Sequence, residues 1–202
     1  IRWLLDQKKR TLVTGCMATA QPGTLLKLVN RNEIIPLESF KSWSPESSSG
    51  EKRRRPVKWF EELPQIPSRP VHGRAILPIS RGCLGNCSYC IVRNAVGPLR
   101  SYGKSEIVSK ARQLIKKGAL EFYLTAQDLA VYGKDNKGDL LDLLTSLSKL
   151  DGDFRIRLGM MTPNQATPII HDLLVLLARN EKFYQFLHLP VQSGDDRILR
   201  IM

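Results

Sequence analysis

The stretch Cys83-Leu84-Gly85-Asn86-Cys87-Ser88-Tyr89-Cys90 decides how this chain is interpreted. It follows residues 75–79, a short apolar run that predicts a β-strand. Three thiols in so tight a loop cannot all pair with one another as disulfides, but they can hold three corners of a cubane iron–sulfur cluster. The fourth iron is then free to bind a small molecule. Gly82 and Gly85 allow the backbone to wrap tightly around such a cluster.

Zinc is the alternative metal for these cysteines. Structural zinc usually shows paired C-x₂-C motifs and a fourth ligand, whereas this chain has no second cysteine pair and His72 is the nearest extra candidate. The spacing therefore favours an iron–sulfur cluster over zinc or over buried structural cysteines.

The cysteine motif lies at the start of a region in which strand and helix patterns alternate. Apolar or alternating runs predict strands over residues 75–79, 121–125, 154–158 and 184–189. This order favours an α/β fold with a parallel sheet or a barrel segment over residues 75–202. Four strands cannot close an eight-stranded barrel, and Met202 lies inside a further helical pattern, so the barrel is expected to be partial.

Capping residues locate the helices between these strands. We expect Ser105 to cap a helix that Gly118 ends, and Asp139 to cap the next helix. Thr167 and Pro168 are expected to open a third helix, with Pro168 at its first position.

Two further segments precede this region. Residues 1–40 are expected to be the end of a small α/β domain, with a strand over residues 11–14, Cys16 on the loop that follows it, a short helix over 24–29 and a strand over 33–37. Residues 41–74 are serine-rich, basic and proline-rich, and we interpret them as an inter-domain linker. Within it, Arg53, Arg54 and Arg55 are candidate phosphate contacts and Trp59 is a candidate for stacking on a base. The alternative is a solvated linker with Trp59 packed on a neighbouring domain.

Composition limits the possible partners. The 202 residues include 31 Lys and Arg against 19 Asp and Glu, a formal net charge of +12. This excess favours a polyanionic partner such as nucleic acid, although it is also compatible with high solubility alone. A hydrophobic content of 42% excludes wholesale disorder, and no apolar run is long enough to span a membrane. The chain begins at Ile1 without a signal-peptide pattern, and we expect it to be an excised fragment.

The cysteine motif resembles the signature of the radical S-adenosylmethionine (radical SAM) superfamily, which is C-x₃-C-x₂-C after the first barrel strand. The resemblance implies that Cys83, Cys87 and Cys90 bind a [4Fe-4S] cluster and that Tyr89 lies near the adenine of S-adenosylmethionine. In that superfamily the open iron chelates the methionine part, and one electron from the cluster cleaves a C–S bond to give a 5′-deoxyadenosyl radical.

Other segments are similar to the methylthiotransferases within that superfamily. The Cys-Leu-Gly-Asn-Cys loop and Gly159-Met160-Met161 look most like the archaeal and eukaryotic branch, which is associated with 2-methylthiolation of N6-threonylcarbamoyladenosine at tRNA position 37. The matching segments occur in the same order across nearly the whole chain, at residues 13–18, 79–90, 97–102, 124–128, 132–133, 155–161 and 188–194.

This resemblance implies further site residues. Cys16 corresponds to the last of three cysteines that hold an auxiliary cluster, so two clusters are expected in the complete protein. The segment containing Thr125, Gln127 and Asp128 takes the place of a motif that meets the methionyl amine. Arg157 is a candidate for the methionine carboxylate. The strand end that follows supplies the candidates Gln192 and Ser193.

Simpler interpretations remain open for several of these residues. Asp128 also suits a turn cap, Arg157 a solvated strand face, and Cys16 a small buried position. Where relatives often carry an arginine before a loop glycine, this chain has Val96-Gly97, which puts any contact predicted there in question.

The leading functional hypothesis is a tRNA-modifying radical SAM methylthiotransferase of the cytoplasm, with tRNA as substrate and S-adenosylmethionine as cofactor. The electron donor is not indicated by the sequence, and this fragment is not expected to complete the full reaction. The alternatives are a protein-modifying methylthiotransferase of the same family and a non-catalytic, zinc-stabilised RNA-binding module.

Overall fold

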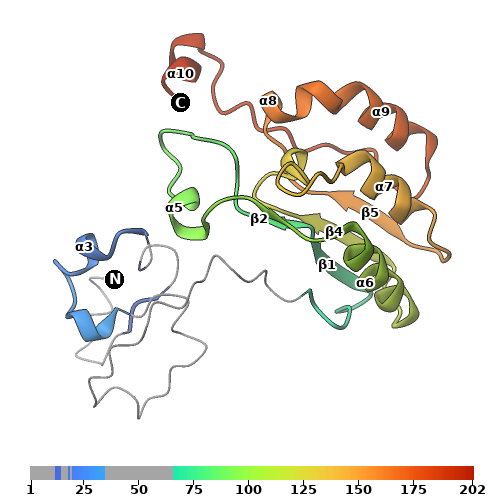
Figure 1. Ribbon diagram of the computed structural model, residues 1–202, viewed down its shortest axis with the longest axis horizontal. Helices are drawn as coiled ribbons and strands as arrows, with labels where there is room; N and C mark the ends of the chain where they lie inside the picture. The colour runs from blue at the N-terminus through green and yellow to red at the C-terminus, as the bar shows by residue number, and fades with distance from the viewer. Residues whose placement is uncertain (1–11, 15–17, 19, 35–65) are drawn as a thin grey trace. The chain divides into compact units, whose positions relative to one another are not determined.

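The computed structural model describes residues 12–14, 18, 20–34 and 66–202 (Figure 1). The chain divides into two compact units. The larger contains Leu63–Tyr89 and Pro98–Met202, and the smaller contains Ile1–Glu62 and Cys90–Gly97. None of the helices in the described residues is both long and apolar enough to cross a membrane.

The larger unit is built on a parallel three-stranded sheet in the order β1-β4-β5. The strands are β1 (Arg74–Pro78), β4 (Glu121–Thr125) and β5 (Arg155–Leu158). Their register places Ile76, Tyr123 and Arg157 side by side in one row across the sheet. Buried side chains alternate with more exposed ones along each strand, because successive residues point to opposite faces.

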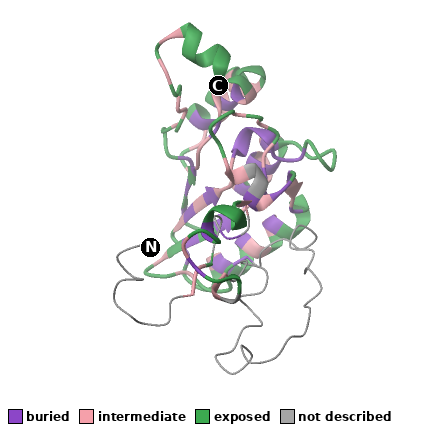
Figure 2. Ribbon diagram, turned by 90° about the vertical axis from the view of Figure 1, so that its left-hand side faces the viewer, coloured by how far each residue is buried: buried purple, intermediate pink, exposed green. Residues whose placement is uncertain are grey.

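Three helices cover one face of this sheet. They are α6 (Lys104–Lys116), α7 (Leu140–Ser148) and α9 (Ile170–Arg179), and α7 packs against both of the others. In Figure 2, buried residues are marked in purple on both strands and helices of this unit. The fully buried side chains of the core include Leu77, Ile107, Leu114, Phe122, Leu124, Leu143, Leu144, Leu147 and Ile156.

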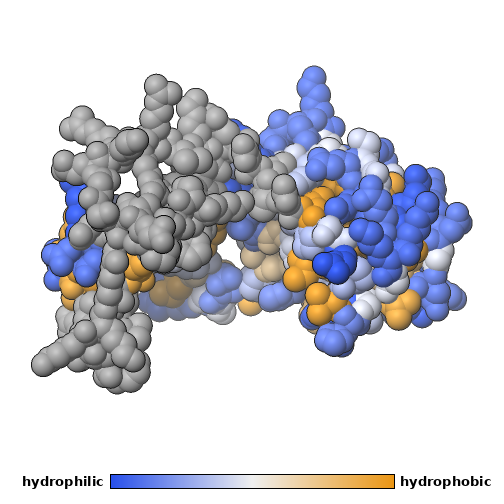
Figure 3. All heavy atoms as spheres, turned by 90° about the horizontal axis from the view of Figure 1, so that it is seen from below, coloured by the Kyte–Doolittle hydropathy of each residue, from blue (hydrophilic) through white to orange (hydrophobic). Residues whose placement is uncertain are grey.

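The opposite face of the sheet is more open. Ile76 is 57% exposed, and Arg157 is also exposed, although both lie in strand interiors. The surface drawn in Figure 3 shows hydrophobic residues in separate groups among hydrophilic ones. The sheet is therefore packed on one side, as in a segment of a β/α barrel whose inner face is not enclosed.

Short elements extend the carboxyl ends of the strands. β2 (Ser80–Arg81) continues from β1 and pairs antiparallel with β3 (Arg100–Ser101). The 3₁₀ helix η3 (Leu129–Val131) follows β4. The segments α8 (Pro163–Ala166) and η4 (Thr167–Ile169) lead into α9, and α10 (Asp196–Ile201) is the last helix described.

The smaller unit has a minor core of its own. Ala18, Leu25 and Val29 are buried in it, and Val13 pairs with Ile34 in a parallel bridge. Its described helices are α3 (Pro22–Leu25), η1 (Arg31–Glu33) and α5 (Val92–Val96). Asn30 and Glu33 form a capping box at the start of η1.

Several sequence predictions are confirmed. The strands over 75–79, 121–125 and 154–158 correspond to β1, β4 and β5, with shifts of one residue in β1 and β5. Asp139 caps α7, and its side chain accepts a hydrogen bond from the Asp142 amide at 2.8 Å. Gly118 follows the end of α6 with a φ of +86°, a conformation that glycine adopts readily.

The prediction of a fourth strand over residues 184–189 is wrong. Residues 184–189 form no regular strand, and the backbone pairs here only as isolated parallel bridges of Phe183 with Ile156 and of His188 with Met160. Between these bridges the Phe186 amide donates to the Tyr184 carbonyl at 2.8 Å, which is a local turn. Because this donor is used within the segment, no continuous ladder forms.

The predicted helix starts also need correction. α6 begins at Lys104 after the N-cap Gly103, so Ser105 lies in its first turn rather than at its cap. Thr167 and Pro168 form the 3₁₀ turn η4, and α9 begins at Ile170. The short helix predicted over 24–29 is observed as α3, which ends at Leu25.

The last part of the predicted linker belongs to the larger unit. Ile66 is 8% exposed and is part of the main core, and Val71 forms an antiparallel bridge with Arg74. The rest of the linker, with Arg53, Arg54, Arg55 and Trp59, lies outside the described residues, as does Cys16.

Replacing Asp139 with Ala should destabilise the larger unit by about 1 kcal/mol, because the Asp142 amide then loses its acceptor. Urea unfolding measures the change. Asp139→Asn is the control, since an asparagine side chain caps equally well, and equal losses for both variants would contradict the capping role.

Candidate functional site

The carboxyl ends of the parallel strands bring three separate segments to one edge of the sheet. The first segment is the cysteine motif, which follows β2. The second begins at Thr125, the last residue of β4, and ends at Asp128. The third follows β5 and contains Met160 and Thr162. Backbone hydrogen bonds connect these exits: the Ile79 amide donates to Thr125, and the Leu129 amide donates to Met160, each at 3.0 Å. In open parallel sheets this edge is where ligands bind.

Cys83 and Cys87 lie on either side of Gly85. A Cβ atom at Gly85 would lie 3.3 Å from the sulfur of Cys83 and 3.7 Å from that of Cys87. The Gly85 amide also donates a hydrogen bond to the Cys83 sulfur at 3.1 Å. Two thiols and a backbone N–H directed at sulfur fit the ligand set of an iron–sulfur cluster, in which such hydrogen bonds tune the metal.

The third cysteine is placed differently. Cys90 is exposed and belongs to the segment Cys90–Gly97 of the smaller unit. Among the described residues, no group of three His, Cys, Asp or Glu side chains is close enough to hold a metal ion. The structure therefore brings Cys83 and Cys87 together, and the participation of Cys90 remains a prediction.

Gln127 contacts the beginning of the cysteine loop. Its side-chain oxygen accepts a hydrogen bond from the Gly82 amide at 2.7 Å, and Gly82 directly precedes Cys83. The predicted contact of Gln127 with a methionyl amine would use the same oxygen, which already has this protein donor.

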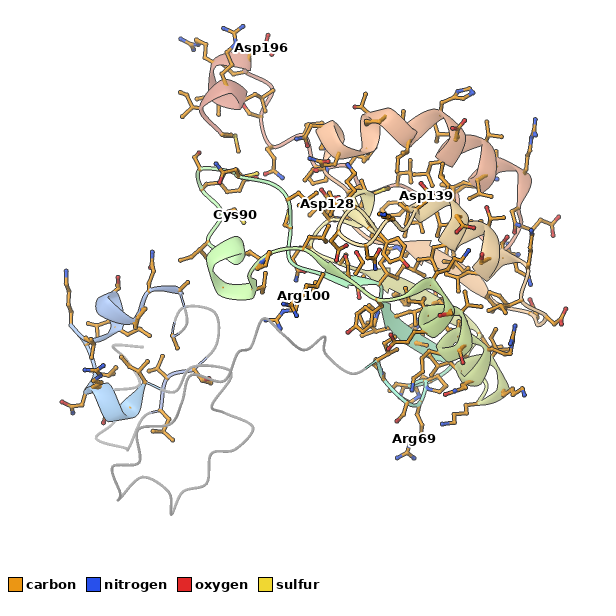
Figure 4. The ribbon with its side chains drawn as sticks, in the orientation of Figure 1. Arg69, Cys90, Arg100, Asp128, Asp139 and Asp196 are labelled. Carbon is orange, nitrogen blue, oxygen red and sulfur yellow. The ribbon has the colours of Figure 1, made fainter. Side chains whose placement is uncertain are left out.

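Asp128 is fully buried, with 0% exposure, and lies within the larger unit between strands and helices (Figure 4). Its carboxylate accepts hydrogen bonds from the Ala130 amide at 3.0 Å and from both the amide and the hydroxyl of Thr162. These bonds cap η3 and join the exits of β4 and β5. They match the simpler interpretation of Asp128 as a turn cap, and its cofactor contact stays a prediction.

Arg157 lies on the open face of the sheet. Its guanidinium carbon is 4.6 Å from the ring centroid of Phe186 and 5.8 Å from that of Tyr123. Stacking of this kind orients an arginine while leaving its N–H groups free to bind a carboxylate. This arrangement is compatible with the predicted contact to the methionine carboxylate.

The remaining predicted cofactor residues are spread along the same loops. Tyr89 is 55% exposed, and Thr125 is half-buried at the end of β4. Gln192 is exposed with a φ of +67°, an uncommon conformation for a residue other than glycine. The Ser193 hydroxyl accepts from the Asp195 amide at 3.1 Å, just before α10.

Two residues that sequence reasoning did not identify help to hold this edge together. The Tyr132 hydroxyl donates to the Tyr102 carbonyl at 3.0 Å, and burial raises the pKa of Tyr132 to about 12, so it stays protonated. Thr162 binds Asp128 as described above. Tyr132 lies in the segment 132–133 that resembles the methylthiotransferases, but nothing in the sequence indicates the partner of either residue.

Comparison with known proteins assigns the chain to a family. The model of the Radical SAM superfamily matches residues 77–202, which include all three cysteines of the motif. The chain belongs to the Radical SAM superfamily. Its parallel sheet and covering helices are consistent with a partial radical SAM barrel, as the sequence predicted.

Several relatives of this chain are named methylthiotransferases. The chain is 37% identical, over its full length and 48% of the relative, to a probable threonylcarbamoyladenosine tRNA methylthiotransferase of Pyrococcus horikoshii. It is 52% identical, over 62% of the chain and 29% of the relative, to the protein of the same name in Methanocaldococcus jannaschii. A ribosomal protein uS12 methylthiotransferase of Thermodesulfovibrio yellowstonii is 39% identical over 62% of the chain and 29% of its own length.

These comparisons confirm the resemblance to radical SAM methylthiotransferases. The chain spans about half the length of the Pyrococcus relative and less of the other two.

Replacing Asp128 with Ala should destabilise this radical SAM chain by about 3 kcal/mol, because it removes the acceptor for one buried and two part-buried donors. Thermal or urea unfolding measures the loss, and the exposed Asp153→Ala provides the matched control. A stability equal to that of the unmodified chain would contradict the structural role of these hydrogen bonds.

Proposed function

We propose that the chain is the catalytic part of a radical SAM enzyme that transfers a methylthio group to C2 of N6-threonylcarbamoyladenosine at tRNA position 37. The observation that carries this proposal is the match, over the full chain, to an archaeal protein named as a probable threonylcarbamoyladenosine tRNA methylthiotransferase. The paired thiols around Gly85 support it, because they supply cluster ligands at the edge of the sheet where a substrate would bind.

Cys83, Cys87 and Cys90 would hold the [4Fe-4S] cluster of this enzyme. When bound, that cluster supplies the single electron needed to cleave S-adenosylmethionine. Radical chemistry suits this reaction because the C2–H bond of adenine is inert to ordinary acid–base catalysis. The role of the chain's own residues is to bind, orient and shield the reactants.

The residues of the open edge divide these binding roles. Arg157, oriented by Phe186, would bind the methionine carboxylate, and Tyr89 would lie beside the adenine. Thr125, Gln192 and Ser193 remain candidates for further cofactor contacts. Cys16 remains a candidate ligand of an auxiliary cluster, which requires two more cysteines.

A tRNA substrate suits the charge of the chain. The net charge of +12 favours phosphate contacts, and the target base has to be splayed out of its stack to reach the cluster. Arg53, Arg54, Arg55 and Trp59 remain candidate RNA contacts. We expect the enzyme to act in the cytoplasm, and its electron donor is still to be identified.

Anaerobic reconstitution with iron and sulfide should give a brown protein with about one four-iron cluster, since the chain contains one complete three-cysteine motif. Cys87→Ala should remove the colour, because it removes a ligand, whereas the control Cys16→Ala should keep most of it. Metal analysis and visible absorbance measure both. Stoichiometric zinc without visible absorbance would contradict the cluster and favour the RNA-binding module.

The whole enzyme that contains this chain should methylthiolate tRNA that carries N6-threonylcarbamoyladenosine. Mass spectrometry of the digested nucleosides detects the product. The same tRNA with unmodified adenosine at position 37 is the control and should give none. Modification of ribosomal protein uS12 instead of tRNA would overturn the proposed substrate and support the protein-modifying alternative.

A further inference from the structure

The cysteine loop begins where regular strand pairing ends. The antiparallel pairing of β2 with β3 stops at Arg81, and Gly82 follows with a φ of +80°. The Gly82 amide therefore needs an acceptor from outside this ladder. Gln127, 45 residues further along the chain, supplies it at 2.7 Å.

The identity of the accepting atom follows from chemistry. A backbone N–H is a donor, so the Gln127 atom that faces it must be the amide oxygen rather than the nitrogen. A glutamate at this position would offer an equivalent oxygen, whereas a leucine of similar size would offer none. Asparagine would be one methylene group too short to reach.

The segment that carries Gln127 is itself fixed on both sides. Before it, the Thr125 carbonyl accepts from the Ile79 amide at 3.0 Å. After it, Asp128 is held by Ala130 and Thr162. An acceptor on so constrained a backbone can restrain the group that it binds.

We propose that Gln127 is a positioning residue that holds Gly82, and through it Cys83, in place for cluster binding. This rests on the proposed function, in which Cys83 is a cluster ligand. Cys83 is the next residue after Gly82, and its sulfur already accepts from the Gly85 amide at 3.1 Å. Losing a partner that orients a metal ligand typically lowers metal affinity by roughly 10- to 100-fold.

The first measurement needs no cofactor. Hydrogen exchange of the Gly82 amide in the cluster-free chain should become about tenfold faster in Gln127→Leu, because the amide loses its acceptor. Gln127→Glu should restore slow exchange, and Gln127→Asn should not. Gln113→Leu, the same change at an exposed position of α6, is the matched control and should leave Gly82 unchanged.

The second measurement uses the chain loaded anaerobically with iron and sulfide. In the presence of an iron chelator, the cluster absorbance should decay roughly tenfold faster in Gln127→Leu than in the unmodified chain. Gln127→Glu and Gln113→Leu should decay more slowly than Gln127→Leu. Unfolding midpoints close to that of the unmodified chain would show that the fold is retained, and if Gln127→Leu does not fold, Gln127→Asn takes its place.

The outcomes separate this inference from the proposed function. Unchanged Gly82 exchange, or unchanged cluster lifetime, in Gln127→Leu would overturn the positioning role. If the unmodified chain binds no iron–sulfur cluster, both the proposed function and the role of Gln127 in cluster binding fail. In that case the exchange data would still show whether Gln127 holds Gly82.

Discussion

All strands of the main sheet run in the same direction, and the architecture around them follows from that constraint. Parallel neighbours need a crossover connection, and in this chain α6 and α7 make the two crossovers. With α9 they cover one face of the sheet and form the core, while the other face stays open. The same constraint brings every strand exit to one edge, so the cysteine loop meets segments that lie far away in the sequence.

Two of the charged residues on the open face, Glu121 and Arg157, have different kinds of partner. Glu121 accepts from the Tyr184 hydroxyl at 2.6 Å and pairs with Arg74 at 3.2 Å. The hydrogen bond from Tyr184 is the main cause of its lowered pKa. Arg157, nearer the carboxyl edge, stacks on aromatic rings instead, which leaves its charge available for an anion. This contrast favours Arg157 over Glu121 as a ligand-binding residue.

The sequence predicted those strands and helix caps that depend on interactions between residues a few positions apart. β4 and the Asp139 cap were predictable, because alternation and capping involve residues a few positions apart. Residues 184–189 show a similar alternation but form no strand, since the Phe186 amide is bonded within its own segment. The cysteine motif predicted the superfamily, and the comparisons confirm it. The bonds of Gln127 and Asp128 join residues 45 and 34 positions apart, and no local pattern indicates such partners.

Gln127 and Asp128 are neighbours on one loop, but they stabilise different parts of the site. Asp128 is buried, and its carboxylate accepts hydrogen bonds from Thr162, which follows it in the sequence. Its loss would leave these donors without an acceptor and would lower the stability of the whole unit. Gln127 is half-buried, and its side-chain oxygen accepts a hydrogen bond from the amide of Gly82, which precedes it in the sequence and lies next to Cys83. The stability of the sheet edge and the placement of the cysteine loop therefore depend on different side chains. A change at Gln127 can alter the placement of Cys83 with less effect on the core than a change at Asp128, because Gln127 accepts from one part-buried amide of the cysteine loop.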